Sequence, residues 1–555
     1  MLRTTGAAGR EDMLNMESWT SWLAGDGRRR LETSLAEWLP RQRWFGAKAR
    51  AISSVRMLRW AEVPLELDGA ADLNRKPLRG LSAALLHAEV TYSGGDRDVY
   101  QVPVALSAGE GAEEIASEAV LERLETAQGV AVLHDATSRK DVRQALLGLI
   151  ARNATLPLHT PETAELNVGQ VEAHTAGAFA AGAQETSRVS TNEQSNTSIV
   201  YGDRLILKLF RRLEPGENPD VEMGRFLSTT AKFPQIAPLL GTLTMTAADG
   251  EPGTLAMLQG FVPNEGDGWS WFLAQTGVFF AAVDVALPEV FDAWPEAVRT
   301  AARPSLEAAA LLGQRTAELH LALSVPTEDA SFSAEPVTCA HLEEDSRRIE
   351  AQFAVACDLL QTKLAGLDET SCHASMQLLA RRRALLERIY AISAMPAAGQ
   401  RIRIHGDYHL GQTLRTRGDC GGDFILIDFE GEPVRSLAER RSKQSPLKDV
   451  AGMVRSFAYA AFAGLDEFLK TQGAFNADAN YLKAWAAQWE KAATAEFLAC
   501  YWETMAANSA LLPPPAQAEV LLRALVLEKA LYELVYELNH RPAWLHIPLN
   551  GILRL

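Results

Sequence analysis

One stretch, residues 401–433, constrains the fold of this chain more than any other. It interrupts a long run of helical periodicity with two polar motifs, HGDYHLGQ (405–412) and FILIDFEG (424–431). The second motif is an apolar run, typical of a buried strand, that ends in a carboxylate. The polar stretch TRGDCGGD between the motifs predicts a hairpin turn. We therefore expect Asp407, Gln412 and Asp428 to converge on one point.

The rest of the chain divides into a strand-rich part and a helical part. A helix over 19–39 and strands at 56–60, 84–92 and 99–106 predict a small α+β cap over residues 1–110. A hairpin at Gly202-Asp203 and a strand at 254–262 predict a β-rich lobe within 111–262, and a helix is expected over 141–152. Residues 263–555 are mostly helical, and they form the predicted C-terminal lobe.

Composition excludes several classes of protein. The net charge of −16 disfavours nucleic acid and anionic membranes as partners. The five cysteines form no C-x-x-C pair, which argues against structural zinc and a disulfide framework. No signal-peptide core is evident, and no apolar run approaches the ~18 residues of a membrane span. We therefore expect a cytoplasmic protein without nucleic-acid or membrane partners.

The two motifs have the chemistry of phosphoryl transfer. Asp407 and Gln412 are spaced as in the protein-kinase motif H-R-D-x-x-x-x-N, in which Asp accepts the substrate proton and Asn holds magnesium. Asp428 matches the D-F-G aspartate. We predict Asp407 as catalytic base and Gln412 and Asp428 as Mg²⁺ ligands, because Mg²⁺ prefers hard oxygen atoms. The fold class expected is α+β, a bilobal protein-kinase-like fold with an N-terminal α+β cap.

Two other interpretations of these motifs stay open. HGD can be a plain turn, and IDFEG can be a strand end with a polar cap. His405 and His409 are spaced four residues apart and can bind zinc together, although the intervening glycine argues against a regular helix and no third ligand is evident.

Lys208 is the predicted phosphate-binding lysine of the β-rich lobe. It shares one face of the strand 204–210 with Ile206 and Phe210, and a lysine there is unfavourable unless it meets a negative charge. ATP phosphates and a helix carboxylate supply that charge in the kinase Lys–Glu pair. Glu222, in a helix that begins near Pro219, is the predicted partner. The alternative is an edge-strand lysine that extends to solvent.

Two further segments are predicted to bind ATP. Ser195, Asn196, Thr197 and Ser198 follow Gln194 in the place of a kinase glycine-rich loop, where hydroxyls and backbone N–H groups can cover phosphates. A plain turn is the alternative. Backbone groups of Gln259 and Phe261, at the end of the strand 254–262, are predicted to bond the adenine base.

Longer segments extend the pattern beyond the two motifs. They are WLPRQRWFGAKAR (38–50), QSNTS (194–198), YGDRLILKLFRRLEPGENPD (201–220), ILIDFEGEP (425–433) and SPLKDVAGMVRSFAY (445–459). With these segments the chain resembles the maltokinase family, in particular the kinase domain often fused to trehalose synthase. The resemblance covers residues 38–554 and is weakest over 107–185 and 330–395. HGD alone is shared with aminoglycoside phosphotransferases and choline kinases.

The resemblance implies a specific reaction. Maltokinases transfer the γ-phosphate of ATP to the anomeric hydroxyl of maltose, and the product, maltose 1-phosphate, feeds α-glucan (glycogen-like) synthesis from trehalose. The family fold has an N-terminal cap on a bilobal kinase core. Carried over by motif, Asp407 is the base, Gln412 and Asp428 bind Mg²⁺, and Lys208 binds phosphate. Trehalose synthase, whose catalytic domain this chain lacks, becomes an expected partner.

A sugar site is predicted on the helix 525–539. Lys529, Tyr532 and Tyr536 share one face of that helix, and the resemblance implies that matching positions bind maltose. Glu533 and His405 are further candidates for substrate contact. The alternative is a solvated helix face with half-packed tyrosines.

Two more expectations concern the segment after the second motif. Asp449 is expected to brace the loop 405–412. The basic residues of this segment are expected to serve as solvated surface and in packing; they are Arg435, Arg440, Arg441, Lys443 and Lys448.

Other functions compete with a maltokinase. The acceptor can be another sugar such as glucosamine. A non-catalytic kinase-like partner of trehalose synthase is a second alternative, which the intact motifs disfavour. An antibiotic phosphotransferase is a third, which the long N-terminal part disfavours.

Overall fold

The chain folds into two compact units in the computed structural model. Unit 1 comprises Met1–Arg225 and Ala237–Phe261, and unit 2 comprises Phe226–Ile236 and Val262–Leu555. The boundary after Phe261 lies one residue from the predicted end of the β-rich lobe. The structure describes residues 19–23, 25, 27–65, 83–126, 129–161, 169–177, 179, 186–190, 195–247, 250, 252–283, 294–418, 422–471 and 479–555.

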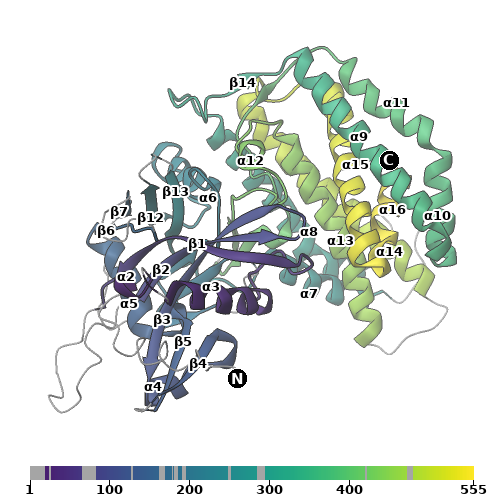
Figure 1. Ribbon diagram of the computed structural model, residues 1–555. Coiled ribbons are helices and arrows are strands. Elements are labelled where there is room, and N and C mark those ends of the chain that lie inside the picture. Colours follow the sequence, from purple (N-terminus) through teal and green to yellow (C-terminus); the bar gives the residue numbers. More distant parts are fainter. Residues whose placement is uncertain are drawn as a thin grey trace. The chain divides into compact units, whose positions relative to one another are not determined.

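The first sheet of unit 1 is antiparallel and belongs to the cap (Figure 1). Its strand order is β1-β2-β3-β5-β4, and the short β11 pairs with β3. The strands are β1 (Ile52–Val63), β2 (Ala83–Tyr92), β3 (Arg97–Ala108), β4 (Val120–Thr126), β5 (Gly129–Asp135) and β11 (Arg212–Leu213). The sheet therefore continues past residue 110, where the cap was expected to end, because β5 pairs with β3 and β4 pairs with β5.

The cap helix packs on this sheet through one face. The predicted helix 19–39 is two helices, α2 (Trp19–Leu23) and α3 (Gly27–Trp38). Leu31, Leu35 and Trp38 recur at helical spacing, and all three are buried with side chains of β1 and β2. A four-residue helix, α4 (Glu110–Glu113), follows β3.

The second sheet of unit 1 is also antiparallel and contains the expected hairpin. Its order is β6-β7-β12-β13-β10-β9-β8. In the hairpin Tyr201 pairs with Leu205, and Gly202 adopts a left-handed backbone at φ +57°. The strands are β6 (Thr155–Pro157), β7 (Gly169–Thr175), β8 (Ser187–Val189), β9 (Thr197–Tyr201), β10 (Leu205–Leu209), β12 (Leu239–Ala247) and β13 (Pro252–Gly260).

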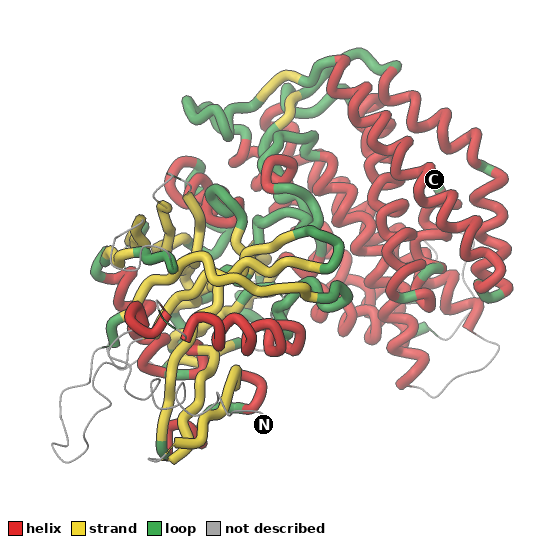
Figure 2. The backbone as a smooth tube through the Cα atoms, viewed as in Figure 1, coloured by secondary structure: helices red, strands yellow, loops and turns green. Residues whose placement is uncertain are grey.

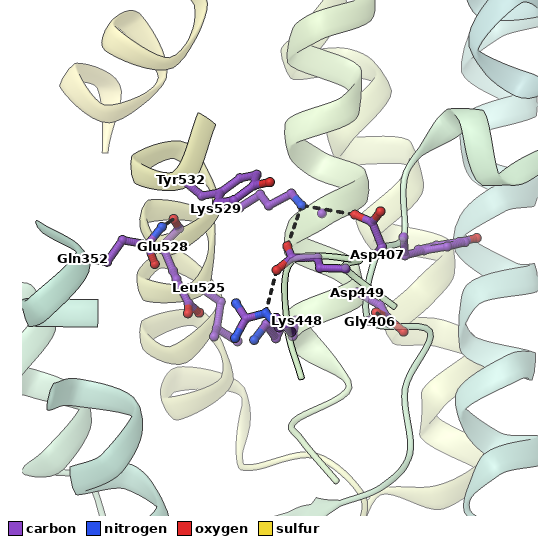
Figure 3. Close-up of a pocket in the computed structure, with 13 residues that line it drawn as sticks. Gln352, Gly406, Asp407, Lys448, Asp449, Leu525, Glu528, Lys529 and Tyr532 are labelled. Carbon is purple, nitrogen blue, oxygen red and sulfur yellow. Dashed lines mark hydrogen bonds and ion pairs between the residues drawn. The ribbon is translucent and has the colours of Figure 1, made fainter. Parts of the chain in front are cut away.

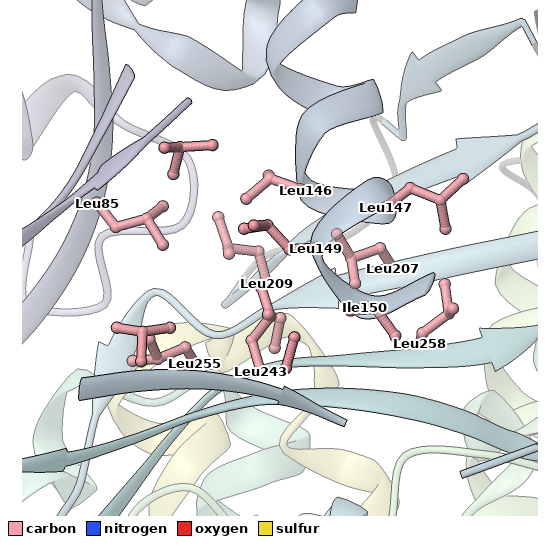
Figure 4. Packing of buried hydrophobic residues seen from close by; sticks show 14 of the residues in the cluster. Leu85, Leu146, Leu147, Leu149, Ile150, Leu207, Leu209, Leu243, Leu255 and Leu258 are labelled. Atoms are coloured by element: carbon pink, nitrogen blue, oxygen red, sulfur yellow. The ribbon is translucent and has the colours of Figure 1, made fainter. Parts of the chain in front are cut away.

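Helix α5 (Lys140–Ala151) confirms the helix expected over 141–152, and its apolar face joins the core of unit 1. Figure 4 shows Leu146, Leu149 and Ile150 of this helix beside Leu207 of β10 and Leu258 of β13. Five leucines or isoleucines buried in this way stabilise unit 1 by about 1.5–3 kcal/mol each. A short helix, α6 (Pro219–Arg225), completes the unit.

Unit 2 is mostly helical, as expected from residue 263 onward (Figure 2). Helices α13 and α15 pack together, and α9 packs on α15. The helices are α7 (Gly268–Ala281), α8 (Glu296–Leu323), α9 (Cys339–Lys363), α10 (Glu369–Ala380), α11 (Arg382–Ser393), α12 (Leu437–Arg440), α13 (Leu447–Thr471), α14 (Ala479–Met505), α15 (Pro515–His540) and α16 (His546–Arg554). None of the helices in the described residues is both long and apolar enough to cross a bilayer.

Two strand pairs interrupt the helices of unit 2. β16 (Thr413–Thr416) and β17 (Asp423–Leu426) form the hairpin predicted between the two motifs. β14 (Glu335–Pro336) pairs with β15 (Gln400–Arg401), immediately before the first motif. The first motif enters the hairpin and the second motif leaves it at the same open end, where Thr413 pairs with Leu426.

Candidate active site

Asp449, in the first turn of α13, braces the loop of the first motif as expected. Its two carboxylate oxygens accept the backbone N–H groups of His405 (2.8 Å) and Gly406 (2.9 Å). The Nε2 of His320 lies 3.3 Å from the same carboxylate. Burial raises the pKa of Asp449, but His320 and these amides outweigh it and hold the pKa below its usual value. The loop is thus fixed by a buried anion.

A glycine lets the loop approach α13 closely. A Cβ atom at Gly452 would lie 2.4 Å from the carbonyl oxygen of Tyr408. The hydroxyl of Tyr408 lies 3.0 Å from Oγ1 of Thr316 on α8. Asp407 therefore projects from a backbone that is held on both sides.

The hairpin brings Gln412 and Asp428 together, as the motif spacing predicts. The backbone N–H of Ile427 donates to the carbonyl of Gln412 (3.1 Å), and Nε2 of Gln412 donates to Oδ2 of Asp428 (2.9 Å). Asp428 has a φ of +66°, a conformation that non-glycine residues rarely adopt. Strain of this kind persists only where the surroundings enforce it, which is typical of functional positions.

His409 belongs to the same loop as Asp407 and Gln412. Its side chain is half-buried, and desolvation lowers its pKa while Asp407 and Asp428 both act in the opposite direction. Both carboxylates are therefore within electrostatic range of one imidazole. The three residues that we expected to converge, Asp407, Gln412 and Asp428, are all gathered around this loop.

Lys529 of α15 links Asp407 to a carboxylate that the sequence interpretation missed. Its Nζ lies 3.4 Å from Oδ1 of Asp407 and 3.0 Å from Oε1 of Glu432. Burial lowers the pKa of Lys529, but these two carboxylates outweigh burial and raise the pKa above its ordinary value. The ammonium therefore stays charged beside the predicted base. Glu432 lies within the ILIDFEGEP segment, four residues after Asp428. Its place in that segment is the sequence feature that could have identified it.

A partly open cavity lies beside Asp407 (Figure 3). Tyr532 lines it next to Lys529, and Gln352 reaches it from α9. Its charged lining residues are Asp407, Glu432, Arg435, Lys448, Asp449, Glu528 and Lys529. Arg435 and Lys448 are half-buried and line this pocket, in keeping with the packing that was expected for part of this basic stretch.

The far end of the cavity carries an alternating charge network. Oε1 of Glu528 accepts a hydrogen bond from Nε of Arg348 (2.8 Å). Oε2 of Glu432 accepts one from Nε of Arg435 (2.6 Å). Burial raises the pKa of Glu528, but Lys448 and Arg348 outweigh it and lower the pKa to about 2. Burial lowers the pKa of Lys448. These groups come from segments far apart in the chain, so no local sequence pattern could predict that they meet.

Three of the predicted substrate residues lie elsewhere. Tyr536 is 39% exposed and stacks on His540, outside the cavity lining. Glu533 is buried and paired with Arg455 at 2.7 Å, and burial raises its pKa despite that arginine. His405 is 1% exposed, and its Nε2 lies 3.0 Å from the carbonyl oxygen of Ile427. Of the predicted sugar residues, Lys529 and Tyr532 line the cavity.

In unit 1, Lys208 forms an ion pair with Asp220. The distance from Nζ to Oδ2 is 2.9 Å, and both side chains are buried. The expected carboxylate partner was Glu222, which is also buried, two residues further along α6. Asp220 and Glu222 both lie in the first turn of α6, so Glu222 stays a predicted residue of this site.

Arg211 holds residues 195–198, the segment that occupies the place of a kinase glycine-rich loop. Its Nε donates to Oγ1 of Thr197 (2.8 Å), and its backbone N–H donates to Oδ1 of Asn196 (3.4 Å). Its guanidinium also pairs with Asp135 of the cap at 2.6 Å and lies over the ring of Trp44. Ser195 precedes these contacts, and Ser198 lies opposite Lys208 in the sheet. Gln194 lies outside the described residues.

The predicted adenine-binding segment ends β13. Gln259 lies opposite Ile206 in the sheet. The backbone N–H of Phe261 donates to the carbonyl of Arg204 at 2.7 Å. That N–H is therefore engaged within unit 1, and only the carbonyl of Phe261 keeps the role expected for it.

Comparisons with known proteins agree with this architecture. Residues 38–138 match the maltokinase N-terminal cap domain. The glucosamine kinase of Mycolicibacterium smegmatis is 28% identical over 365 residues, which cover 65% of this chain and 77% of that protein. The glucosamine kinase of Streptacidiphilus jiangxiensis is 27% identical over 364 residues, 64% of this chain and 70% of that protein.

A solved structure supports the fold across most of the chain. It is a glucosamine kinase in complex with glucosamine, ADP and inorganic phosphate, with a TM-score of 0.56 and 22% identity. The match covers 88% of this chain and 93% of that one. This likeness shows the fold, and the matched cap domain and the two kinase relatives indicate a sugar phosphotransferase that carries a maltokinase-type cap.

Proposed function

We propose that the chain is an ATP-dependent maltokinase that converts maltose to maltose 1-phosphate. The observation that carries the proposal is the position of Lys529, whose ammonium lies between Asp407 and Glu432 beside the cavity. Glucosamine, the ligand of the solved relative, carries an amino group that is protonated near neutral pH. In this chain the two carboxylates nearest the reaction centre already have a cation between them.

This arrangement favours a neutral sugar over an amino sugar. A second ammonium next to Lys529 meets a like charge in a partly buried site, which is unfavourable by several kcal/mol. The hydroxyl groups of a neutral sugar instead accept from Lys529 and donate to Glu432. The ring of Tyr532, 5.1 Å from Nζ of Lys529, offers an apolar surface for a sugar face.

Asp407 acts as the base in the proposed reaction. Its carboxylate takes the proton of the anomeric hydroxyl while that oxygen forms a bond to the γ-phosphorus of ATP. The bond from the γ-phosphorus to the bridging β,γ oxygen breaks, and ADP leaves with the electron pair. A positioned carboxylate of this kind contributes about 10²–10⁴-fold to the rate.

Asp428 and Gln412 are the proposed holders of Mg²⁺. Their side chains meet at 2.9 Å, and a half-turn of the Gln412 amide presents its oxygen beside the carboxylate. Two protein oxygens fit this ion, which usually keeps several waters and binds substrate phosphates as well. When bound, Mg²⁺ neutralises the charge on the phosphate oxygens.

Residues of unit 1 are proposed to hold ATP. Lys208 is buried next to Asp220, the pairing expected of a lysine that orients phosphates. The hydroxyl of Ser195 and the backbone of Asn196, Thr197 and Ser198 are proposed to cover the phosphates, with Glu222 nearby and with Gln259 and Phe261 beside the base. ADP in the solved relative is consistent with a nucleotide as phosphate donor.

The metabolic setting follows from the product. Maltose 1-phosphate carries an activated glucosyl group, so we propose a cytoplasmic role in α-glucan (glycogen) synthesis. Trehalose synthase, which the family resemblance suggests as a partner, would supply maltose.

An acceptor panel tests the proposal. The purified chain is incubated with ATP and Mg²⁺ and with maltose, glucose, glucosamine or an aminoglycoside, and ADP release is measured. Mass spectrometry and ³¹P NMR identify the product and the phosphorylated position. We expect phosphorylation of maltose at the anomeric oxygen. Preferred turnover of glucosamine would assign the chain to the activity of its named relatives.

Asp407→Asn provides the matched control, because it keeps size and removes the base. We expect turnover to fall about 10²–10⁴-fold with the fold retained. If no sugar is phosphorylated by the unmodified chain while ATP still binds, a non-catalytic kinase-like partner becomes the better description.

A further inference from the structure

An open groove of unit 2 adjoins the cavity beside Asp407. Both spaces are lined by the same four side chains, which are Gln352, Glu432, Arg435 and Tyr532. The groove has a volume of about 350 Å³ and lies between α9, α15 and the loop that follows Glu432. Among the residues that the structure describes, Asp407 and Lys529 line the cavity but not the groove. The groove therefore extends the cavity without reaching the predicted base.

The side chains that line the groove alone are all aliphatic. They are Ala351 and Val355 of α9, Val434 of the loop and Val535 of α15. Val434 is 77% exposed and Val355 is 58% exposed, so both present methyl groups to water. Exposed apolar side chains that gather in one place and are bordered by polar residues are typical of a binding site.

The polar side chains at the boundary between the cavity and the groove are held by neighbours. Nε2 of Gln352 donates to the backbone carbonyl of Glu528 (3.1 Å), and Nε of Arg435 donates to Oε2 of Glu432 (2.6 Å). The other oxygen of Glu432, Oε1, accepts from Nζ of Lys529 at 3.0 Å. These bonds fix the boundary, and the lining beyond it offers apolar contact.

We propose that the groove binds the second ring of a neutral disaccharide acceptor through the C–H face of that ring. This inference rests on the proposed function, which places the reacting ring beside Asp407 and Lys529. A second ring linked to the reacting one passes Tyr532 and enters the groove, where a monosaccharide does not reach. Burial of its C–H surface against the valines stabilises the complex, while the hydroxyl groups on its other side stay in water.

Apolar recognition of the second ring predicts which acceptors the chain uses. A site that hydrogen-bonds a substrate hydroxyl rejects the analogue without it by roughly 10⁴–10⁵-fold, whereas an apolar site does not. The chain is therefore expected to require a second ring and to tolerate the loss of a hydroxyl group from it. We expect kcat/KM for 6′-deoxymaltose to be within about threefold of that for maltose, and kcat/KM for glucose to be at least about tenfold lower.

Steady-state kinetics of the full chain with ATP and Mg²⁺ test the proposal. The variant Val355→Ser/Val434→Ser is expected to raise the KM for maltose at least about fivefold, because apolar contact area is lost, and to leave kcat and the KM for glucose unchanged. Val355→Ile/Val434→Ile retains the apolar surface and is expected to keep the KM for maltose. Val278→Ser/Val520→Ser is the matched control, because it changes exposed valines that line neither space, and it is expected to behave like the unmodified chain.

The outcomes separate this inference from the proposed function. If maltose 1-phosphate forms and the serine variant has an unchanged KM for maltose, the groove is not a sugar site, although the maltokinase activity stands. An equal rise of KM for maltose and glucose, or a loss of more than about a hundredfold with 6′-deoxymaltose, also overturns the apolar second-ring site. If the chain phosphorylates isomaltose instead of maltose and the serine variant loses that preference, the maltokinase proposal fails and the groove inference stands. Turnover of monosaccharides alone overturns both.

Discussion

The Nζ of Lys529 lies 3.4 Å from Oδ1 of Asp407, so the predicted catalytic base is paired with a cation from α15. The same ammonium lies 3.0 Å from Glu432. Lys529 therefore has two effects on the reaction centre: it orients the Asp407 carboxylate, and it places a positive charge where an acceptor sugar is expected to bind.

Replacing Lys529 by methionine is expected to change acceptor preference. Lys529→Met keeps the side-chain length and removes the charge, so an amino sugar no longer meets a like charge beside Asp407. We predict that the ratio of kcat/KM for maltose to that for glucosamine falls at least about tenfold, because removing one like-charge contact is worth more than about 1.4 kcal/mol. Steady-state assays with both sugars measure this ratio.

Two comparisons control for that result. Lys483→Met changes an exposed lysine of α14 and is expected to leave the ratio unchanged. Lys529→Arg retains the charge and is expected to keep the preference for maltose. An unchanged ratio in Lys529→Met would show that this ammonium does not select the acceptor.

Asp449→Asn is expected to disturb the catalytic loop. In this variant an NH₂ group replaces one carboxylate oxygen and cannot accept a hydrogen bond. The backbone N–H of either His405 or Gly406 therefore loses its acceptor, at a cost of about 1–3 kcal/mol. We predict a lower kcat with little change in the KM for ATP, because the predicted ATP-binding side chains belong to unit 1. Urea denaturation and steady-state kinetics measure the two effects, and a normal kcat in a destabilised variant would limit Asp449 to folding.

Arg211→Met is expected to destabilise unit 1. The variant leaves Asp135 buried without the guanidinium that lies 2.6 Å away, and breaking a buried pair from one side costs about 3–5 kcal/mol. Chemical denaturation measures the loss. The double variant Arg211→Met/Asp135→Asn removes the remaining charge and is expected to recover part of the stability. A double variant less stable than the single one would contradict this explanation.

Glu528 is expected to make the free energy of unfolding depend on pH. Its pKa is lowered from 4.5 to about 2 in the folded chain, so its stabilising contribution is complete above the unfolded value and is lost as the pH falls toward the folded value. Between pH 7 and pH 4 the loss from this group is roughly 1 kcal/mol.

Glu528→Gln isolates that contribution. The difference in free energy of unfolding between the unmodified chain and the variant is expected to shrink as the pH falls from 7 to 4. Denaturant titrations at several pH values measure it. A difference that stays constant across this range would mean that Glu528 titrates alike in the folded and unfolded chain.

The parts of the fold and site that the sequence predicted are encoded by short contiguous segments. The hairpin between the two motifs follows from alternating residues around a polar turn, and it brings Gln412 to Asp428. Helical spacing put Lys529 and Tyr532 on one face of α15, and both line the cavity. The switch from strands to helices near residue 262 came from periodicity in the same way.

What only the tertiary structure decided is the partner of each charge. Lys208 forms an ion pair with Asp220, a carboxylate that the sequence interpretation did not name beside Glu222. Arg435, Lys448 and Glu528 have the composition of solvated surface, yet the packing of α9, α13 and α15 encloses them around one cavity. Periodicity reports which face of a segment is apolar, but burial and pairing of charges depend on which other segment covers it, and that is fixed only when distant parts of the chain pack together.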